Sequence, residues 1–545
     1  MSPTASALLL TAPVAVPLAV AGTYTLAALR TRSTAATLAA ALTEARRRGS
    51  AQGSVLVVEA PEPSLVPQWH MGDWVSLVSP AVILTCGSLL AADVVDHGPR
   101  RAYSGLLRAD ALTAWMLLVV GVVALTACAS APAYLRGERI AGRASERAVM
   151  GVPPLERSRE WGSYHVLVQA FLAAMCLAVV TANLGVLWVA VEATTIVTAF
   201  LVGHRHTRTS VEAAWKYVVI CSAGIALAFL GTVLIYYAAR QTGIAEAWAL
   251  DWPTLVARAD RLDPAVTRLG ITLVVLGFGA KAGLIPLHAW LPDAHSQAPA
   301  PVSALMSGVL LSVAFSAILR YRVIADAALG AGFTRVLLAG IALLTLALAA
   351  GLLLAQRDYK RMLAYSSMEH MSLIALAAAI GSPLALSAAL LHIAGHGLAK
   401  SAAFCASGRI LQLTGTTKIG RVRGLLARDP ALAGTFGFAV VALMAFPPFS
   451  LFASELGIAR AGFLAGSGLG WVTAAALLLV LVAFAALAAR TARMLLGPAP
   501  APPARPEPAA VWPLAVGLAA CAALGVCLGP LTDLLHAAAL AIGGH

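Results

Sequence analysis

Long apolar segments are the feature of this 545-residue sequence that most constrains its fold. The hydrocarbon core of a bilayer is about 30 Å thick, so a helix needs roughly 20 apolar residues to cross it. Fourteen segments of suitable length lie near residues 6–29, 76–94, 110–131, 165–182, 185–203, 212–238, 269–286, 300–320, 334–355, 362–380, 384–411, 432–459, 470–490 and 511–535. The sequence therefore predicts an all-α integral membrane protein with about 14 transmembrane helices.

The composition supports this class. Hydrophobic residues make up 60% of the chain, charged residues make up 12%, and the mean hydropathy is +0.83. Such values exclude a water-soluble domain. The first apolar segment has no basic residue before it, so we expect it to stay in the mature chain rather than act as a cleavable signal peptide.

The net charge of +13 comes from basic residues that lie between the apolar segments. In that position they set the orientation in the membrane, and they do not indicate nucleic acid. One alternating set of connections carries roughly twice as many basic residues as the other, which the positive-inside rule assigns to the cytoplasm. The pattern predicts that both termini lie outside.

The cysteines give no sign of a redox centre. The seven cysteines are scattered singly through apolar segments, with no C-x-x-C pair and no iron–sulfur spacing. No Gly-rich nucleotide loop stands between a strand and a helix either. If the protein takes part in redox chemistry, we expect the electrons to pass through another chain.

Lysine usage is the first sign of function. The chain has 33 arginines but only five lysines, and three of these, Lys216, Lys281 and Lys400, fall inside apolar segments. Arginine effectively never loses its proton, whereas burial can bring the pKa of lysine down by several units. A site that binds and releases protons can therefore use lysine.

Intramembrane acids and histidines extend this pattern. Glu192 and Glu455 lie far from any connection, where an unpaired carboxylate is costly. His392, His396 and Lys400 follow at i, i+4 and i+8, which drift by only about 80° around a helix and share one face. With His370 in the preceding span, they are typical of a proton path across a membrane.

Several of these residues also have a purely structural interpretation. His370 alone could be a hydrogen bond between helices, and Glu192, Lys281 and Lys400 could be buried ion pairs. Other polar residues near span ends or connections are expected to be interfacial or solvated: Glu212, Glu369, His288, Asp293 and His295.

Metal binding by His392 and His396 is a further alternative. The i, i+4 spacing suits zinc, but no Glu follows the first His as in H-E-x-x-H, and Lys400 would repel a cation. The sequence therefore favours proton transfer over a metal site at this pair.

Prolines predict two interrupted helices. Pro286 and Pro292 follow Lys281, and Pro447 and Pro448 precede Glu455. A proline removes a backbone hydrogen bond and breaks or kinks a membrane helix. Two broken helices in separate halves, each near an ionisable residue, are typical of a transporter built from repeats.

The motifs also carry a family resemblance. KAGLIPLHAWLPDAHSQAPAPVSAL, RDYKRMLAYSSMEHMS, HGLAKSAAF and the span ending in ASELG resemble the antiporter-like membrane subunits of respiratory complex I, Mrp-type cation/proton antiporters and membrane-bound hydrogenases. TANLGVLWVAVEATTIVTAFLVG and EAAWKYVVICSAGIALAFLG most resemble the F-type membrane subunit of hydrogenase 4 and formate hydrogenlyase.

The resemblance implies a fourteen-helix fold with two inverted five-helix repeats, each forming a half-channel with a broken helix. It divides the chain into N-terminal helices with a cytoplasmic connection (1–109), an antiporter-like core (110–460) and C-terminal helices (461–545).

The resemblance also assigns roles to residues. Glu192 matches the glutamate that modulates the first half-channel, and Lys281 matches the lysine on the first broken helix. The other matches are Lys216 on an intervening helix, His370, His396 and Lys400 on the central path, and Glu455 on the second broken helix. Ser312 departs from the pattern, because it stands where some relatives carry a central lysine.

These features predict a proton-translocating subunit of an energy-converting oxidoreductase complex in the bacterial cytoplasmic membrane. Iron–sulfur clusters, a nickel–iron centre or a flavin are expected only in partner subunits, which comprise other membrane subunits and a peripheral redox module. One alternative is an Mrp-type sodium/proton antiporter subunit without a redox partner. Another is a scaffold protein whose channel is inactive.

Overall fold

The structure, a computed structural model, describes residues 2–50, 74–148, 157–466, 468–498 and 511–543. Within these residues the regular secondary structure is helical except for a short hairpin of β1 (Arg100–Ala102) and β2 (Leu107–Ala109), which pair antiparallel. Connections 51–73, 149–156 and 499–510 lie outside the described residues, and they include part of the basic set used to predict orientation.

The helices run in the following order. The first half contains α1 (Pro3–Ser50), α3 (Val78–His97), α4 (Ala111–Ala148), α5 (Arg157–Val180), α6 (Leu184–Val202), α7 (Arg208–Gln241), α8 (Trp252–Ala257), α9 (Pro264–Lys281), α10 (Leu291–Gln297) and α11 (Ala300–Leu305). The second contains α12 (Leu311–Leu329), α13 (Ala331–Ala355), α14 (Tyr359–Ile380), α15 (Pro383–Thr414), α16 (Leu425–Arg428), α17 (Pro430–Leu443), α18 (Ser450–Leu464), α19 (Leu469–Leu495), α20 (Trp512–Val526) and α21 (Leu531–Gly543).

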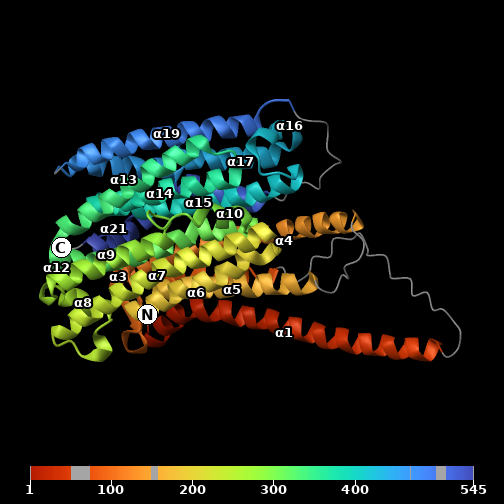
Figure 1. Ribbon diagram of the computed structural model, residues 1–545. Coiled ribbons are helices and arrows are strands. Elements are labelled where there is room, and N and C mark those ends of the chain that lie inside the picture. The colour runs from red at the N-terminus through yellow and green to blue at the C-terminus, as the bar shows by residue number, and fades with distance from the viewer. Residues whose placement is uncertain (1, 51–73, 149–156, 467, 499–510, 544–545) are drawn as a thin grey trace.

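The long helices lie side by side in one bundle, with their axes roughly along one direction (Figure 1). By length and composition, 11 helices of the described residues can cross a membrane, or up to 12 if the bent pair α20 and α21 counts as one. The prediction of fourteen spans is therefore recovered only in part. Interrupted segments fall short of the required length: α17 has 14 residues and α18 has 15.

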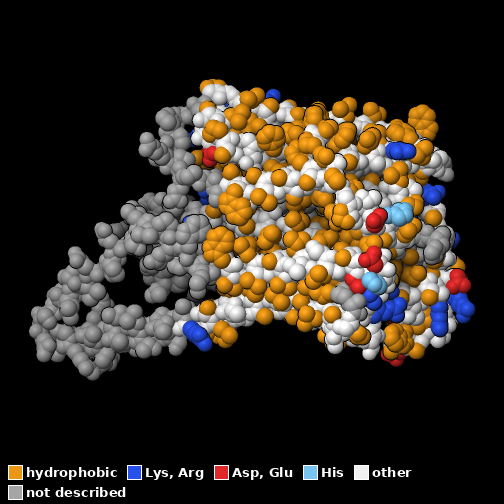
Figure 2. All heavy atoms as spheres, turned by 180° about the vertical axis from the view of Figure 1, so that it is seen from behind, with side chains coloured by type: hydrophobic (Ala, Val, Ile, Leu, Met, Phe, Trp, Pro, Cys, Tyr) orange, Lys and Arg blue, Asp and Glu red, His pale blue; other side chains and the backbone are white. Residues whose placement is uncertain are grey.

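The outer surface fits a membrane environment. Hydrophobic side chains cover most of the face seen in Figure 2, and charged side chains gather mainly toward one end of it. Exposed large hydrophobic residues are common on the long outer helices, with Val336, Trp471 and Leu478 among them. An apolar rim of this kind is what lipid tails or neighbouring membrane subunits would cover.

Both predicted helix breaks are confirmed. α9 ends at Lys281, and an irregular stretch containing Pro286 separates it from α10. α17 ends at Leu443, and a stretch containing Pro447 and Pro448 separates it from α18. The structure adds a third break between α20 and α21, which are bent by 78° and which the sequence predicted as one span.

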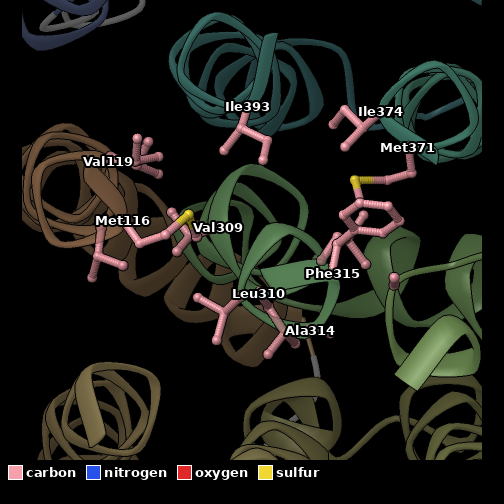
Figure 3. Close-up of a cluster of buried hydrophobic side chains, with 14 of the residues drawn as sticks. Met116, Val119, Val309, Leu310, Ala314, Phe315, Met371, Ile374 and Ile393 are labelled. Carbon is pink, nitrogen blue, oxygen red and sulfur yellow. The ribbon is translucent and has the colours of Figure 1, made fainter. Parts of the chain in front are cut away.

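A central helix holds the bundle together. α15 packs against α4, α11, α14, α17, α18, α20 and α21, and its side chains from Ala388 to Gly408 are buried. Apolar side chains from α4, the π-helical turn η5 (Met306–Leu310), α12, α14 and α15 meet beside it in a tight cluster (Figure 3). This cluster includes Met116, Leu310, Phe315, Met371 and Ile393.

A buried ion pair joins α4 to α12 at one end of the bundle. Asp110 accepts a hydrogen bond from the backbone N–H of Thr113 at 3.0 Å and two from the Arg320 guanidinium. That guanidinium lies 4.6 Å from the ring centroid of Trp252, whose Nε1 donates to the Arg320 carbonyl at 2.8 Å. The positive charges of Arg320 and Arg108, with these hydrogen bonds, stabilise the buried Asp110 carboxylate.

We predict that Asp110→Asn destabilises the bundle, because it leaves the Arg320 guanidinium buried without its counter-charge, a loss of about 3–5 kcal/mol. The measurement is the thermal unfolding midpoint of the purified native complex. The matched control is Asp260→Asn, which changes an exposed carboxylate and should leave the midpoint unchanged. Equal midpoints for both variants would contradict the structural role of the pair.

Candidate functional site

Lys281 lies at the end of α9, immediately before the first break, and its side chain is fully buried. Its Nζ donates hydrogen bonds to Thr195 Oγ1 at 2.8 Å and to the Tyr217 hydroxyl, and lies 4.8 Å from the Tyr217 ring centroid. The ammonium is thus held by neutral hydroxyls from α6 and α7. Because these partners carry no charge, they stabilise a protonated lysine only weakly, and the proton can be lost.

Glu192 lies on α6, one turn before Thr195. Its Oε1 accepts a hydrogen bond from Ser222 of α7 at 3.2 Å, and its buried Oε2 has no hydrogen-bond partner among the described residues. Glu192 and Lys281 are therefore not in direct contact, but they share the seam between α6 and α7. Side chains three residues apart on a helix are neighbours, so Thr195 connects the two groups.

The prediction of a buried Lys216 is wrong. Its side chain is 46% exposed, and it forms ion pairs with Glu212 at 2.7 Å and with Asp293 at 3.3 Å. Asp293 also binds Arg361, so α7, α10 and α14 meet at one cluster of charges. Asp293 was expected to be merely solvated, and it is instead the centre of this cluster. Lys216 lies on the exposed face of α7, whereas the next residue, Tyr217, is buried.

Lys400 is fully buried in the middle of α15. Its Nζ donates to the Leu363 carbonyl at 2.7 Å and to Ser366 Oγ, both on α14. Glu369, one turn further along α14, acts on Lys400 as an opposite charge. The expectation that Glu369 is interfacial is wrong, since it is 2% exposed and its Oε2 has no hydrogen-bond partner among the described residues.

Three histidines and Glu455 come together beyond Lys400. His370 Nδ1 lies 3.1 Å from His392 Nε2, and His392 Nδ1 lies 2.9 Å from Ser454 Oγ. The ring centroid of His396 lies 5.1 Å from that of His370. A Glu455 carboxylate oxygen, on α18 after the second break, lies within 4.8 Å of one ring nitrogen of His370 and one of His392. The structure therefore gathers the predicted residues of the second half at one place.

Two buried groups were not singled out from the sequence. His295 on α10 was expected to be solvated, but it is fully buried, and both of its ring nitrogens have no partner among the described residues. Its ring lies 6.1 Å from Trp290 and 5.3 Å from Phe404, measured between centroids. Lys360 is also fully buried, with its Nζ 3.5 Å from the Ser296 carbonyl.

These two groups sit near Lys400. The ammonium groups of Lys360 and Lys400 both act electrostatically on the His295 imidazole. The burial of Lys360 could have been predicted from Asp358. This residue caps the N-terminus of α14 and so places Lys360 inside the helix rather than in the connection before it. No comparable signal exists for His295, because its burial depends on packing against α15.

Ser312 offers no polar connection between the two halves. Its hydroxyl is buried and without a partner among the described residues. The apolar cluster of Figure 3 includes Val309, Leu310, Ala314 and Phe315, on either side of Ser312 in the chain. A proton cannot pass through such a cluster unless water enters it.

The comparisons with known proteins agree with the resemblance drawn from the motifs. Residues 181–481 match the family described as "NADH:quinone oxidoreductase/Mrp antiporter, TM". The chain belongs to this family of membrane proteins.

Within the family, the chain is 42% identical over 303 residues to "Hydrogenase-4 component F homolog" of Methylacidiphilum infernorum, a match that covers 55% of this chain and 63% of that protein. It is 31% identical over 405 residues to "NADH-quinone oxidoreductase subunit N" of Desulforudis audaxviator, covering 71% of this chain and 75% of that one.

Two solved structures share the fold. One is a chain of the archaeal membrane-bound sulfane sulfur reductase, with a TM-score of 0.77, 24% identity and coverage of 100% of this chain and 98% of that chain. The other is a chain of the Mrp complex from Dietzia sp., with a TM-score of 0.77, 21% identity and coverage of 99% and 98%. At these identities the likeness concerns the fold alone.

The burial of Lys360 can be measured. We predict that a water-soluble amine-reactive reagent modifies Lys418, whose side chain is 62% exposed, and leaves Lys360 unmodified in the native complex. Peptide mass spectrometry quantifies both lysines, and the denatured sample provides the reference in which both react. Modification of Lys360 at the rate of Lys418 in the native sample would contradict its burial.

Proposed function

We propose that this chain is the proton-translocating membrane subunit of an energy-converting oxidoreductase complex. The observation that carries the proposal is Lys281, a buried lysine at a helix break that only neutral hydroxyls hold. Intramembrane ionisable residues are costly and are retained where they move charge. The relatives named for hydrogenase 4 and NADH-quinone oxidoreductase support the assignment to such a complex.

The first step takes place at the α6–α7 seam. While Glu192 is charged, its field stabilises a proton on Lys281. When Glu192 is neutralised or turns away, the ammonium keeps only Thr195 and Tyr217, and its proton becomes free to leave. Lysine is suited to this step because arginine would keep its charge.

The second step runs around the apolar cluster rather than through Ser312. His295 provides two ring nitrogens with no partner among the described residues, inside the electrostatic reach of Lys400. An imidazole can accept a proton at one nitrogen and release one from the other. Water molecules between Lys281 and His295 would complete the link between the halves.

The third step follows the histidines. Lys400 passes the proton by way of His396 to His370, then to His392 over the 3.1 Å contact, and finally to Glu455. The second helix break lies just before Glu455, where freed backbone groups can hold water. Lys216 would act from outside this path, through the charge cluster that it forms with Asp293.

The proposal includes finer features of architecture. If α15, the broken pair α17 and α18, and the bent pair α20 and α21 each cross the membrane, the spans number fourteen. We further propose two inverted repeats around the breaks, the division at 110 and 460, and both termini outside the cytoplasm. Iron–sulfur clusters, a nickel–iron centre or a flavin would belong to a peripheral redox module made of partner chains.

The Mrp-type alternative, exchange of sodium for protons, is favoured by the description of the matching family, which names the Mrp antiporter. Hard cations such as sodium require oxygen ligands. The buried groups along the path are mainly lysines and imidazoles, which carry protons. The side chains therefore support proton transfer in preference to sodium transport.

The test is proton pumping by inverted vesicles that contain the native complex. Lys281→Ala should abolish pumping coupled to electron transfer while the subunits still co-purify, and Lys281→Arg should fail as well because arginine keeps its charge. The control is Lys418→Ala, which changes an exposed lysine and should pump normally. Pumping by Lys281→Arg at the native rate would overturn the proposal.

A further inference from the structure

One group of three side chains has the residue types and spacing of a metal site. His370 of α14, His392 of α15 and Glu455 of α18 each offer a ligand atom, and these atoms all lie within 4.8 Å of one another. His396, which the sequence spacing had paired with His392, is not part of this group. Three separate helices therefore converge with two imidazoles and one carboxylate.

The ligand set is one that zinc uses. Zinc is commonly bound by two histidines and one glutamate with a fourth position open to water, at bond lengths of about 2.0–2.2 Å. Ligand atoms of such a tetrahedral site are about 3.4 Å apart, and the two imidazole nitrogens, at 3.1 Å, already approach that spacing. Glu455 is half-buried, so its long side chain has room to complete the site.

Hydrogen bonds prepare His392 for this role. Ser454 donates its hydroxyl proton to the Leu451 carbonyl at 2.9 Å, so its oxygen accepts from His392 Nδ1. That fixes the tautomer of His392 and leaves the lone pair of Nε2 directed toward His370. Metal-bound histidines are usually oriented by such a partner.

His370 can change its tautomer. In the absence of a metal, the proton of the 3.1 Å contact resides on His370 Nδ1, because His392 Nε2 is the acceptor. His370 Nε2 has no partner among the described residues. The proton can therefore move to Nε2 when a cation displaces it from Nδ1, and no hydrogen bond of the structure is lost other than the one the metal replaces.

Charge and access also suit a cation. Glu455 and Glu369 place two carboxylates near this group, and they oppose the single ammonium of Lys400. Glu455 lines a small cavity between α14, α18 and α19, with Thr473 on its far wall. This cavity leaves space beside the Glu455 carboxylate.

We propose that His370, His392 and Glu455 form a binding site for a divalent transition-metal ion such as Zn²⁺. Binding follows from the geometry of these three side chains. Inhibition of proton pumping by the bound ion rests on the proposed function. If that function is correct, the ion occupies two histidines and the glutamate that pass the proton, and pumping stops.

The experiment uses the native complex and Zn²⁺ alone. After incubation and removal of free ions, elemental analysis counts the bound zinc, and X-ray absorption identifies its ligands. We expect a single added zinc ion per copy with imidazole and carboxylate ligation. Glu455→Ala and His392→Ala should each weaken binding more than about 100-fold, since loss of a partner that only orients a ligand already costs about 10–100-fold.

His396→Ala is the matched control, because it removes the neighbouring imidazole without touching the ligand set, and it should bind zinc as the native chain does. Equal binding by all four chains, or sulfur ligation in the X-ray spectrum of the unaltered complex, would overturn the site. The X-ray absorption spectrum of the unaltered complex identifies the zinc ligands without any variant. A variant chain that fails to assemble therefore does not prevent the test. Zinc bound as expected with pumping unchanged would support the site and count against the proposed path.

Discussion

The cost of burying an ammonium in a membrane protein shapes the rest of this structure. Moving a charge out of water is costly unless hydrogen bonds and opposite charges replace the solvent. At Lys281 the replacement of solvent is incomplete. Two hydroxyls accept hydrogen bonds from the Nζ, and Glu192, which lies at the seam between α6 and α7, does not bind the ammonium directly. The helix break directly follows Lys281, α7 packs against α9, and hydroxyls of α6 and α7 are directed at this side chain. An ammonium held so weakly is one that a small change of field can discharge.

The second half of the molecule repeats the arrangement with different residues. Lys400 is bound by a carbonyl and a hydroxyl of α14, and its counter-charge, Glu369, lies one turn away. The apolar cluster of Figure 3 lies beside α15, between α4 and α14, and fills that region with apolar side chains. Separation of this kind is what a pump requires, because an uninterrupted wet path would let protons leak. His295 of α10 and His396 of α15 both have ring nitrogens without a partner among the described residues, and both are within electrostatic reach of Lys400.

The sequence predicted the features that depend on local chemistry. Prolines placed both breaks, and the apolar surroundings of Lys281, Lys400 and the histidines of α15 predicted their burial. Features that depend on packing between distant segments were missed. Lys216 has similar apolar neighbours to Lys281 in the chain, yet its end of α7 meets Asp293 at the surface. His295, Lys360 and Glu369 looked peripheral because each lies near a connection or a span end, and helices far away in the sequence cover them. The span count differs partly for a related reason, since α17 and α18 are each shorter than a membrane, while the polar α15 is long enough but is not among the 11 apolar helices.

The central claim is that Glu192 and Lys281 act as one electrostatic unit, and a double-mutant cycle on the pumping rate tests it most directly. The cycle compares Glu192→Gln, Lys281→Ala and the double variant in vesicles of the native complex, with assembly checked by co-purification. Residues that act as a unit are not additive, so the double variant should pump no worse than Lys281→Ala alone, and Glu192→Asp should keep part of the rate because its charge survives. Pumping by Glu192→Gln at the native rate would contradict the account, because Lys281 would then work without its counter-charge.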